Sequence, residues 1–406
     1  MINFNRIIYI IFIFFCFFPF INIFGLPTDS QPNALFLSII IIFLNHKILI
    51  KHFPLNFFYL IIPFLTAFTL LIFQEKSLEN LISFISYFGL LTIPLAVVLI
   101  LIKLDGFPEV YFKISVIIWA IVGVIQKFIY QNFLSFLLTR SVGSGNNGRG
   151  VNSLAPEPTY YGSVILLFIM LFFLNSNFKK KSIILFILLF QLFILSLSTT
   201  VFAVIIFAFI IFLLLNIFQY KISLNKIFKI SILTILIFIV NYIFKDYYSN
   251  TRFYKIFSII YENPELVFID ESINERFNHA FFPLINLFHN FGLPMGFNKF
   301  TDYVNRLNNN NEFYILLKNI NIQHYKKIMS GYGAALFELG LISFFIPYFI
   351  YKHFKPFLFE NKIQFLFILL NTLLFTSISL NNPLLLFVIG NIVYNGNFKN
   401  KNYNLS

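Results

Sequence analysis

Charged residues are scarce in this 406-residue chain. Asp, Glu, Lys and Arg make up only 11% of the sequence, whereas 59% of its residues are hydrophobic. Soluble domains carry about 25% charged and about 45–50% apolar residues. So few charges cannot cover a water-facing surface. The composition therefore excludes a soluble globular protein and indicates that the lipid bilayer is the main solvent of the chain.

Cysteine is almost absent as well. The one cysteine, Cys16, lies inside an apolar segment near the start of the chain, so neither an internal disulfide nor a cysteine metal cluster can form. Two of the histidines, His279 and His289, are ten residues apart and do not match the close spacing of H-E-x-x-H. We therefore expect no bound metal and no other cofactor.

Long apolar runs take the place of the missing charges. A membrane-spanning helix needs roughly 20 mostly apolar residues. Twelve segments approach this length, at 6–24, 33–46, 54–73, 81–102, 110–130, 158–175, 182–196, 199–218, 227–244, 332–351, 363–379 and 382–395. We predict an all-α integral membrane protein with about 12 transmembrane helices, folded as a single polytopic membrane domain over residues 1–406.

Basic residues in the short loops predict the orientation. The net charge is +13, and most lysines of the short loops fall on one side of the twelve predicted spans: Lys47, Lys51, Lys103, Lys179, Lys180, Lys181, Lys221, Lys226, Lys352, Lys355 and Lys362. Lysine and arginine are enriched in cytoplasmic loops, so this side and both termini are predicted to be cytoplasmic. Since the positive charge is distributed over membrane loops, we expect no nucleic-acid partner.

Two outer loops hold most of the polar chemistry. The first covers about 131–157 and the second about 245–331, or 87 residues. Loops of this length without structure of their own are uncommon unless they are functional. Patterned stretches at 252–261 and 276–289 predict short helices that lie on the membrane surface.

The first outer loop ends in a proline-flanked glutamate. Glu157 lies between Pro156 and Pro158. A following proline disfavours helical backbone, and proline itself suits the first turn of a helix. We therefore predict that Glu157 is extended and directly precedes a helix. Tyr160 and Tyr161 follow at the membrane boundary, where they can form an aromatic belt or contact a sugar or lipid head group.

Arginines in both outer loops suggest a phosphate-bearing ligand. Arg140 and Arg149 lie in the first loop, and Arg252 and Arg276 in the second. The planar guanidinium group binds phosphate oxygens in a bidentate manner. A pyrophosphate linked to sugars would suit these arginines and the neighbouring aromatic residues, although attraction of anionic lipid heads explains any one of them equally well.

One ionisable residue lies inside a predicted span. Glu338 belongs to the segment SGYGAALFELG at 330–340, which opens the tenth span. A charged group at the centre of a membrane helix costs about 2.5–3.5 kcal/mol on insertion scales, and such groups usually face a cavity or the bundle interior. Glu338 is therefore a candidate substrate-binding residue.

Three stretches together resemble the Wzy-type polysaccharide polymerases, in the superfamily of O-antigen polymerases and ligases. They are RGVNSLAPEPTYYG at 149–162, NERFNHAFFPLINLFHNFGLPMGFNKF at 274–300 and SGYGAALFELGLISFF at 330–345. Thr159 stands where the family usually has serine. Asn381, Asn382 and Pro383 in the last hairpin also fit the pattern, so the resemblance covers roughly 140 to 395.

The resemblance implies a glycosyl transfer on the outer face of the inner (plasma) membrane of a bacterium. Repeat units linked to undecaprenyl pyrophosphate would be joined into O-antigen, capsular polysaccharide or exopolysaccharide. Arg149 and Arg276 would stabilise the leaving pyrophosphate, and Glu157 would either deprotonate the acceptor or hold Arg149 in place. His289 is an alternative base, because an unperturbed imidazole titrates near pH 6.5. The expected substrate contacts are Arg140, Tyr160, Tyr161, Arg252, His279 and Glu338.

Other partners and functions follow from the same reasoning. The expected partners are undecaprenyl-pyrophosphate-linked glycans and membrane lipids, together with a chain-length regulator and a flippase. A ligase of the same superfamily, which transfers finished glycan to another acceptor, needs the same donor site. A flippase or transporter for lipid-linked oligosaccharide is the alternative from another class. Transporters commonly have internal repeats, and this chain shows none.

Overall fold

The computed structural model describes residues 4–23, 28–141, 150–175, 181–219, 256, 258–259, 261, 270–310 and 328–399. Every regular element in these ranges is helical. The α-helices are α1 (Phe4–Phe17), α2 (Asn33–Leu44), α3 (His46–His52), α4 (Phe58–Phe73), α5 (Leu78–Lys103), α6 (Glu109–Phe128), α7 (Pro158–Leu174), α8 (Lys181–Phe190), α9 (Thr199–Gln219), α13 (Glu271–His289), α14 (Phe300–Asn309), α16 (Gly331–Leu339), α17 (Phe345–Phe354), α18 (Asn361–Thr376) and α19 (Pro383–Tyr394). Short 3₁₀ or π stretches are η1 (Leu55–Phe57), η2 (Ser135–Leu137), η3 (Gln191–Ser196), η6 (Gly340–Phe344), η7 (Lys355–Phe357) and η8 (Asn395–Lys399).

Five helices in the described ranges are long and apolar enough to cross a membrane. They are Leu55–Phe73, Leu78–Lys103, Glu109–Phe128, Thr199–Ile217 and Gly331–Phe357. Each coincides with a span expected from the sequence. The chain is therefore a helical membrane protein, as its composition predicts.

The number of twelve spans is not confirmed. Five of the expected spans are apolar helices of 10–17 residues: Phe4–Phe17, Asn33–Leu44, Pro158–Leu174, Lys181–Ser196 and Asn361–Thr376. The expected span at 382–395 is α19 with the start of η8, and the one at 227–244 lies outside the described residues. Apolar runs thus predict where helices form better than how long each helix is.

The core of the bundle forms around α19. Almost every residue of α19 is buried, and the helix packs against α5, α7 and α1. A Cβ atom added to Gly390 would lie 2.6 Å from Cβ of Val97 and 2.8 Å from the carbonyl oxygen of Pro94. Because only glycine fits at that spacing, α19 and α5 approach one another closely, as small residues allow in membrane bundles.

A short break separates η3 from α9. The chain leaves η3 at Ser196, and Leu197 adopts a left-handed conformation with φ 37° and ψ 40°. Thr199 then begins α9, which starts a new axis at this point. The polar residues of the break, Ser198 and Thr200, therefore stand at the N-terminal end of an otherwise apolar helix.

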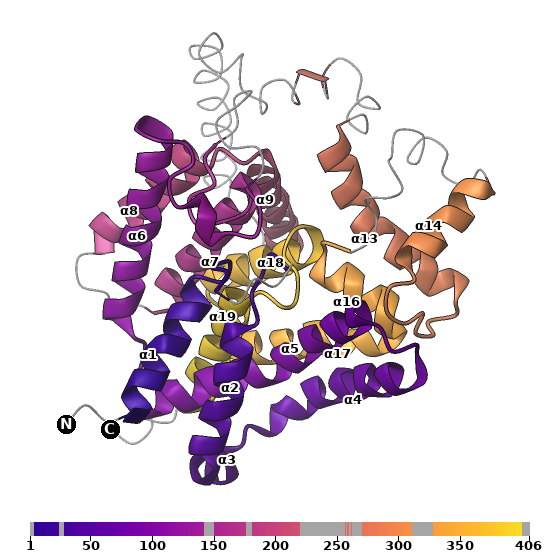
Figure 1. The fold of residues 1–406 in the computed structure, drawn as a ribbon, viewed down its shortest axis with the longest axis horizontal. Coiled ribbons are helices and arrows are strands. Elements are labelled where there is room, and N and C mark those ends of the chain that lie inside the picture. Colours follow the sequence, from indigo (N-terminus) through magenta and orange to yellow (C-terminus); the bar gives the residue numbers. More distant parts are fainter. Residues whose placement is uncertain are drawn as a thin grey trace.

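Two helices from the segment 245–331, α13 and α14, lie together beside α16 (Figure 1). The first, α13, begins after Asp270, whose side chain accepts a hydrogen bond from the backbone N–H of Ile273. The second, α14, packs against α13 through Phe282, Tyr303 and Leu307. Short helices were predicted for this loop, and α13 covers the whole of the patterned stretch 276–289. The other patterned stretch, 252–261, lies largely outside the described residues.

Candidate functional site

The loop before α7 is fixed to the bundle by buried hydrogen bonds. The side chain of Gln126 accepts from the backbone N–H of Ser153 at 2.6 Å and donates to its carbonyl oxygen at 2.9 Å. The backbone N–H of Val151 donates to the carbonyl oxygen of Leu195 at 2.9 Å, which attaches the loop to the end of η3. Satisfied buried polar groups make the loop rigid, so Glu157 at its end has a defined position.

Glu157 has the backbone that its proline neighbours predict. It is extended, with φ −146° and ψ 156°, and α7 begins at Pro158. Its side chain does not cap the helix. Instead, its carboxylate Oε1 lies 2.9 Å from Nη1 of Arg140. The predicted partner of Glu157, Arg149, lies outside the described residues, and the structure assigns Arg140 to this position.

Arg140 also binds a second carboxylate. Its Nε and Nη2 atoms donate to the two carboxylate oxygens of Asp29 at 2.9 and 2.8 Å. This is a bidentate pair, the strongest arrangement between these two groups. The hydrogen bonds that it donates to Asp29 raise the pKa of the guanidinium further above its already high value, so Arg140 is always charged. Asp29 lies in the loop between α1 and α2, and Arg140 therefore connects that loop to Glu157 at the start of α7.

Arg276 approaches the same region from α13. Its Nη1 atom donates a hydrogen bond to the hydroxyl of Thr200, in the first turn of α9. The neighbouring Ser198 hydroxyl donates to the hydroxyl of Thr159 on α7 at 3.3 Å. The N-terminal ends of α7 and α9 therefore lie side by side, with a charged arginine against one of them. Helix N-terminal ends and arginine both favour bound anions.

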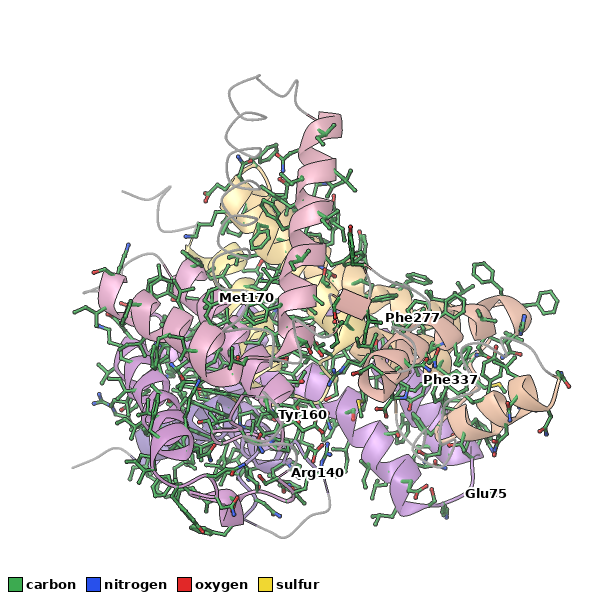
Figure 2. The ribbon with its side chains drawn as sticks, turned by 90° about the horizontal axis from the view of Figure 1, so that it is seen from above. Glu75, Arg140, Tyr160, Met170, Phe277 and Phe337 are labelled. Carbon is green, nitrogen blue, oxygen red and sulfur yellow. The ribbon has the colours of Figure 1, made fainter. Side chains whose placement is uncertain are left out.

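Tyr160, in the first turn of α7, is within electrostatic range of both arginines. The charges of Asp29, Glu157, Arg140 and Arg276 all act on its phenol group. Figure 2 shows Tyr160 and Arg140 near one another at the start of α7. Two arginines that are 136 positions apart in the sequence thus border one polar site.

A large apolar groove begins at Arg276. Its volume is about 630 Å³, and α9, α13 and α18 form its walls. The lining residues on α9 are Thr199, Thr200, Ala203, Val204, Ile206, Phe207 and Ile210, and those on α13 are Ile273, Arg276, Phe277, Ala280, Phe281 and Leu284. Ile256 and, on α18, Thr372, Phe375 and Thr376 also line it. Among the described lining residues Arg276 is the single charged one, and most of the others are apolar.

Tyr161 does not reach this site. It is fully buried, its ring stacks on Trp119 with centroids 5.6 Å apart, and its hydroxyl donates to Gln191 Oε1 at 3.0 Å. In a helix, adjacent residues point in directions about 100° apart, so Tyr160 and Tyr161 cannot share one face. Tyr161 is placed as a packing residue of the bundle rather than as a substrate contact.

Of the two histidines of α13, His279 lies one turn from Arg276, whereas His289 lies far from it. His279 is fully buried, and its Nδ1 atom accepts from the backbone N–H of Met329 at 3.2 Å. Burial lowers its pKa to about 3, so the ring is neutral. His289 lies at the other end of α13, roughly 20 Å from Arg276 at 1.5 Å per residue, and its Nδ1 is 3.3 Å from the Tyr303 hydroxyl. The structure does not bring His289 to the groove.

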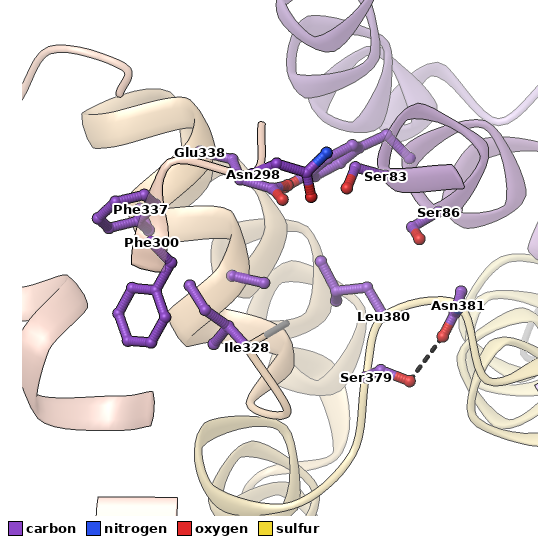
Figure 3. A pocket seen from close by; sticks show the side chains of 12 residues that line it. Ser83, Ser86, Asn298, Phe300, Ile328, Phe337, Glu338, Ser379, Leu380 and Asn381 are labelled. Carbon is purple, nitrogen blue, oxygen red and sulfur yellow. Dashed lines mark hydrogen bonds between the residues drawn. The ribbon is translucent and has the colours of Figure 1, made fainter. Parts of the chain in front are cut away.

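Glu338 belongs to a second, smaller pocket. Tyr87 on α5 donates a hydrogen bond to its carboxylate at 2.5 Å. The other polar lining residues are Ser83, Ser86, Asn298, Ser379 and Asn381, and Figure 3 shows them around a narrow cavity of about 50 Å³. The cavity has room for one or two water molecules. Glu338 is thus directed toward a cavity, as expected for an ionisable residue in a span, but not toward Arg276.

Several expected site residues cannot be placed. Arg149 and Arg252 lie outside the described residues.

Sequence reasoning missed Asp29 and Thr200. Asp29 is the first acidic residue of the chain, an isolated charge between two apolar runs, which was a usable signal. Thr200 directly follows Ser198 and Thr199 in a short polar stretch between two apolar runs. In the described part of the chain, no group of three or more His, Cys, Asp or Glu is placed to hold a metal ion.

Comparisons of the chain with models of protein families, with curated proteins and with solved structures give no match. The geometry and charge of the site therefore carry the functional inference.

Proposed function

We propose that this protein is a membrane glycosyltransferase that polymerises oligosaccharide repeat units carried on undecaprenyl pyrophosphate. The observation that carries the proposal is the polarity of the groove along α9. Arg276 is hydrogen-bonded to Thr200 at the N-terminal end of α9, and apart from Thr372 and Thr376 on α18 the wall beyond is apolar over several turns. A ligand that fits must combine an anionic head with a long hydrocarbon tail.

The dimensions of the groove suit an isoprenoid chain. On α9 its lining runs from Thr199 to Ile210, which is roughly 17 Å at 1.5 Å per residue. Burial of apolar surface contributes about 25 cal/mol per Å², so a tail laid along this wall binds without any directional contact. The head is then held at Arg276, where a pyrophosphate can accept bidentate hydrogen bonds.

The proposed reaction is a displacement at the anomeric carbon. A hydroxyl oxygen of the acceptor sugar forms a bond to that carbon, the bond to the pyrophosphate oxygen breaks, and the hydroxyl proton passes to a base. Negative charge collects on the leaving pyrophosphate. Arg276 and Arg140 supply fixed positive charge there, and prearranged charge of this kind is usually the largest contribution to catalysis.

Glu157 supports this site best as a positioning residue. Its carboxylate Oε1 is 2.9 Å from Nη1 of Arg140, so the side chain is already engaged in holding that guanidinium. Of the two roles expected for Glu157, holding an arginine is thus favoured over proton abstraction. The arginine that it holds is Arg140.

The membrane arrangement is part of the proposal. Twelve spans with both termini in the cytoplasm place the loops at 131–157 and 245–331 on the outer face of the bacterial inner membrane, where lysine is sparse in the short loops. Lipid-linked repeat units would reach the site there, after a flippase has moved them across. A chain-length regulator would act on the growing product.

The decisive experiment deletes the gene and examines the surface polysaccharide by electrophoresis. We expect the ladder of chain lengths to collapse to a single repeat unit, and wild-type protein to restore it. Arg276→Ala should not restore it, whereas Arg306→Ala, an exposed arginine on α14, should. Polymer that stays on its lipid carrier would mean a ligase, and lipid-linked units retained on the cytoplasmic face a flippase. An unchanged ladder would overturn the proposal.

A further inference from the structure

The turn that follows α13 exposes three large apolar side chains. Phe288, Phe291 and Leu293 have 76%, 90% and 62% of their surface exposed. We propose that this turn inserts into the outer leaflet of the bilayer and anchors α13 to the membrane surface. The proposal concerns the fold in its membrane and holds whatever reaction the protein performs.

The backbone conformation of the turn does not favour an apolar side chain at Phe291. The N–H of Gly292 donates to the carbonyl oxygen of Leu287 at 2.7 Å, which closes the end of the helix. Phe291, at the position before Gly292, has φ 52°. Helix ends of this kind favour glycine or asparagine there, because a left-handed conformation is unfavourable for an ordinary L-residue. A phenylalanine at this position, with its ring directed outward, indicates contact with something beyond the chain.

The apolar tip is continuous with a membrane-spanning surface. The N–H of Leu341 donates to the carbonyl oxygen of Gly292 at 2.9 Å. Leu341 is 55% exposed, and Phe344, one turn further on, is 49% exposed. Both belong to the span Gly331–Phe357, whose exposed apolar side faces lipid. Since the turn rests directly on this side, the environment that covers Leu341 also covers Phe291.

The chain after the turn returns to the level of the membrane boundary. The N–H of Phe297 donates to Gln74 Oε1 at 3.0 Å, at the end of α4. Glu75 and Lys76 follow Gln74 and are exposed, as expected where a span enters water. The turn therefore enters the leaflet only shallowly, which fits the 5–10 Å depth typical of interfacial helices.

The anchor has a consequence for α13 as a whole. The helix starts with the polar sequence ESINER and ends beside the exposed Phe288, so the turn would hold its C-terminal end in lipid. Arg276 lies in the first half of the same helix, and its height above the membrane is then set by the turn. This arrangement favours contact of the turn with the bilayer over contact with a protein partner.

Spin labels in proteoliposomes test the anchor directly. In a Cys16→Ala background, we would label Phe291→Cys and Leu293→Cys and measure collision with oxygen, which concentrates in lipid, and with a nickel chelate, which stays in water. Leu65→Cys on α4 is the lipid control, and Asn309→Cys on α14 is the water control; both positions are exposed.

We expect positions 291 and 293 to match Leu65→Cys, with oxygen collisions several-fold above those at Asn309→Cys and little access for nickel. Nickel access equal to that at Asn309→Cys would overturn the proposal. Shielding from both reagents would also overturn it, because it would mean that a protein covers the turn. The labelled positions are exposed, so no core packing is lost, and elution of each variant as one species confirms its fold.

Discussion

Arg140 and Glu157 form an ion pair across the loop that precedes α7, with Nη1 and Oε1 2.9 Å apart. The same guanidinium is held by Asp29 in a bidentate pair. Two carboxylates thus orient one arginine at the start of α7. Its side chain is still 40% exposed, so it remains accessible to a ligand.

Loss of Arg140 should affect activity far more than stability. Partly exposed ion pairs contribute only about 0.2–1 kcal/mol, so Arg140→Ala should unfold at nearly the wild-type temperature while polymer yield falls at least about tenfold. Arg140→Lys keeps the charge but loses the bidentate geometry, and an intermediate yield is expected. Thermal unfolding in detergent and gel analysis of polymer measure the two effects. If the unfolding temperature of Arg140→Ala falls as strongly as its polymer yield, Arg140 stabilises the fold rather than serving the reaction.

A bulky residue in the groove should exclude the lipid tail. Ala203 lines the groove on α9, and Phe209 lies on the same helix outside the lining. We expect Ala203→Trp to weaken binding of the lipid-linked substrate about tenfold or more, whereas Phe209→Trp should bind normally. Both positions are exposed, so neither tryptophan is forced into the core. Binding to undecaprenyl phosphate in nanodiscs is the measurement, and unchanged affinity in Ala203→Trp would place the tail elsewhere.

Gly150 should not tolerate a side chain. An added Cβ would lie 2.0 Å from the carbonyl oxygen of Ser196, whereas at Gly89 the nearest atom would be 3.7 Å away. Gly150→Ala should therefore displace the loop that carries Glu157 from the end of η3, and both polymer yield and unfolding temperature should drop. Gly89→Ala should be close to neutral in both assays. Normal activity of Gly150→Ala would show that this close approach is not required.

Acidification should destabilise the protein through His279. Its pKa is about 3 in the folded state because of burial and the charge of Arg276, against about 6.5 when unfolded. The unfolded chain therefore binds the extra proton first. The stability is complete above about pH 6.5 and falls as the pH drops toward 3, by about 2 kcal/mol at pH 5 at 1.4 kcal/mol per unit.

His279→Asn keeps an acceptor for the N–H of Met329 and cannot be protonated. It should lower stability at pH 7.5 but flatten its decline between pH 7.5 and 5. Unfolding of both proteins is followed at several pH values. Parallel declines would show that His279 is not the group responsible.

The sequence alone determined the membrane class, the position of most helices and the start of α7. Apolar runs need only their own composition to favour lipid, and Pro158 acts on its immediate neighbours. Both are local properties, so they can be recognised without any knowledge of packing. The same locality explains why helix lengths were predicted less well, since α1 ends before Pro19 and α8 passes into a π stretch held by its neighbours.

The tertiary structure decided which of the candidate residues meet. Arg140 was found beside Glu157, and Asp29 joined them from the loop between α1 and α2. His289 and Arg276 share α13 but face different pockets at its two ends. The groove itself exists only because α9, α13 and α18 pack together. Such contacts depend on the free energy of packing helices that are far apart in sequence, and no local pattern contains that information.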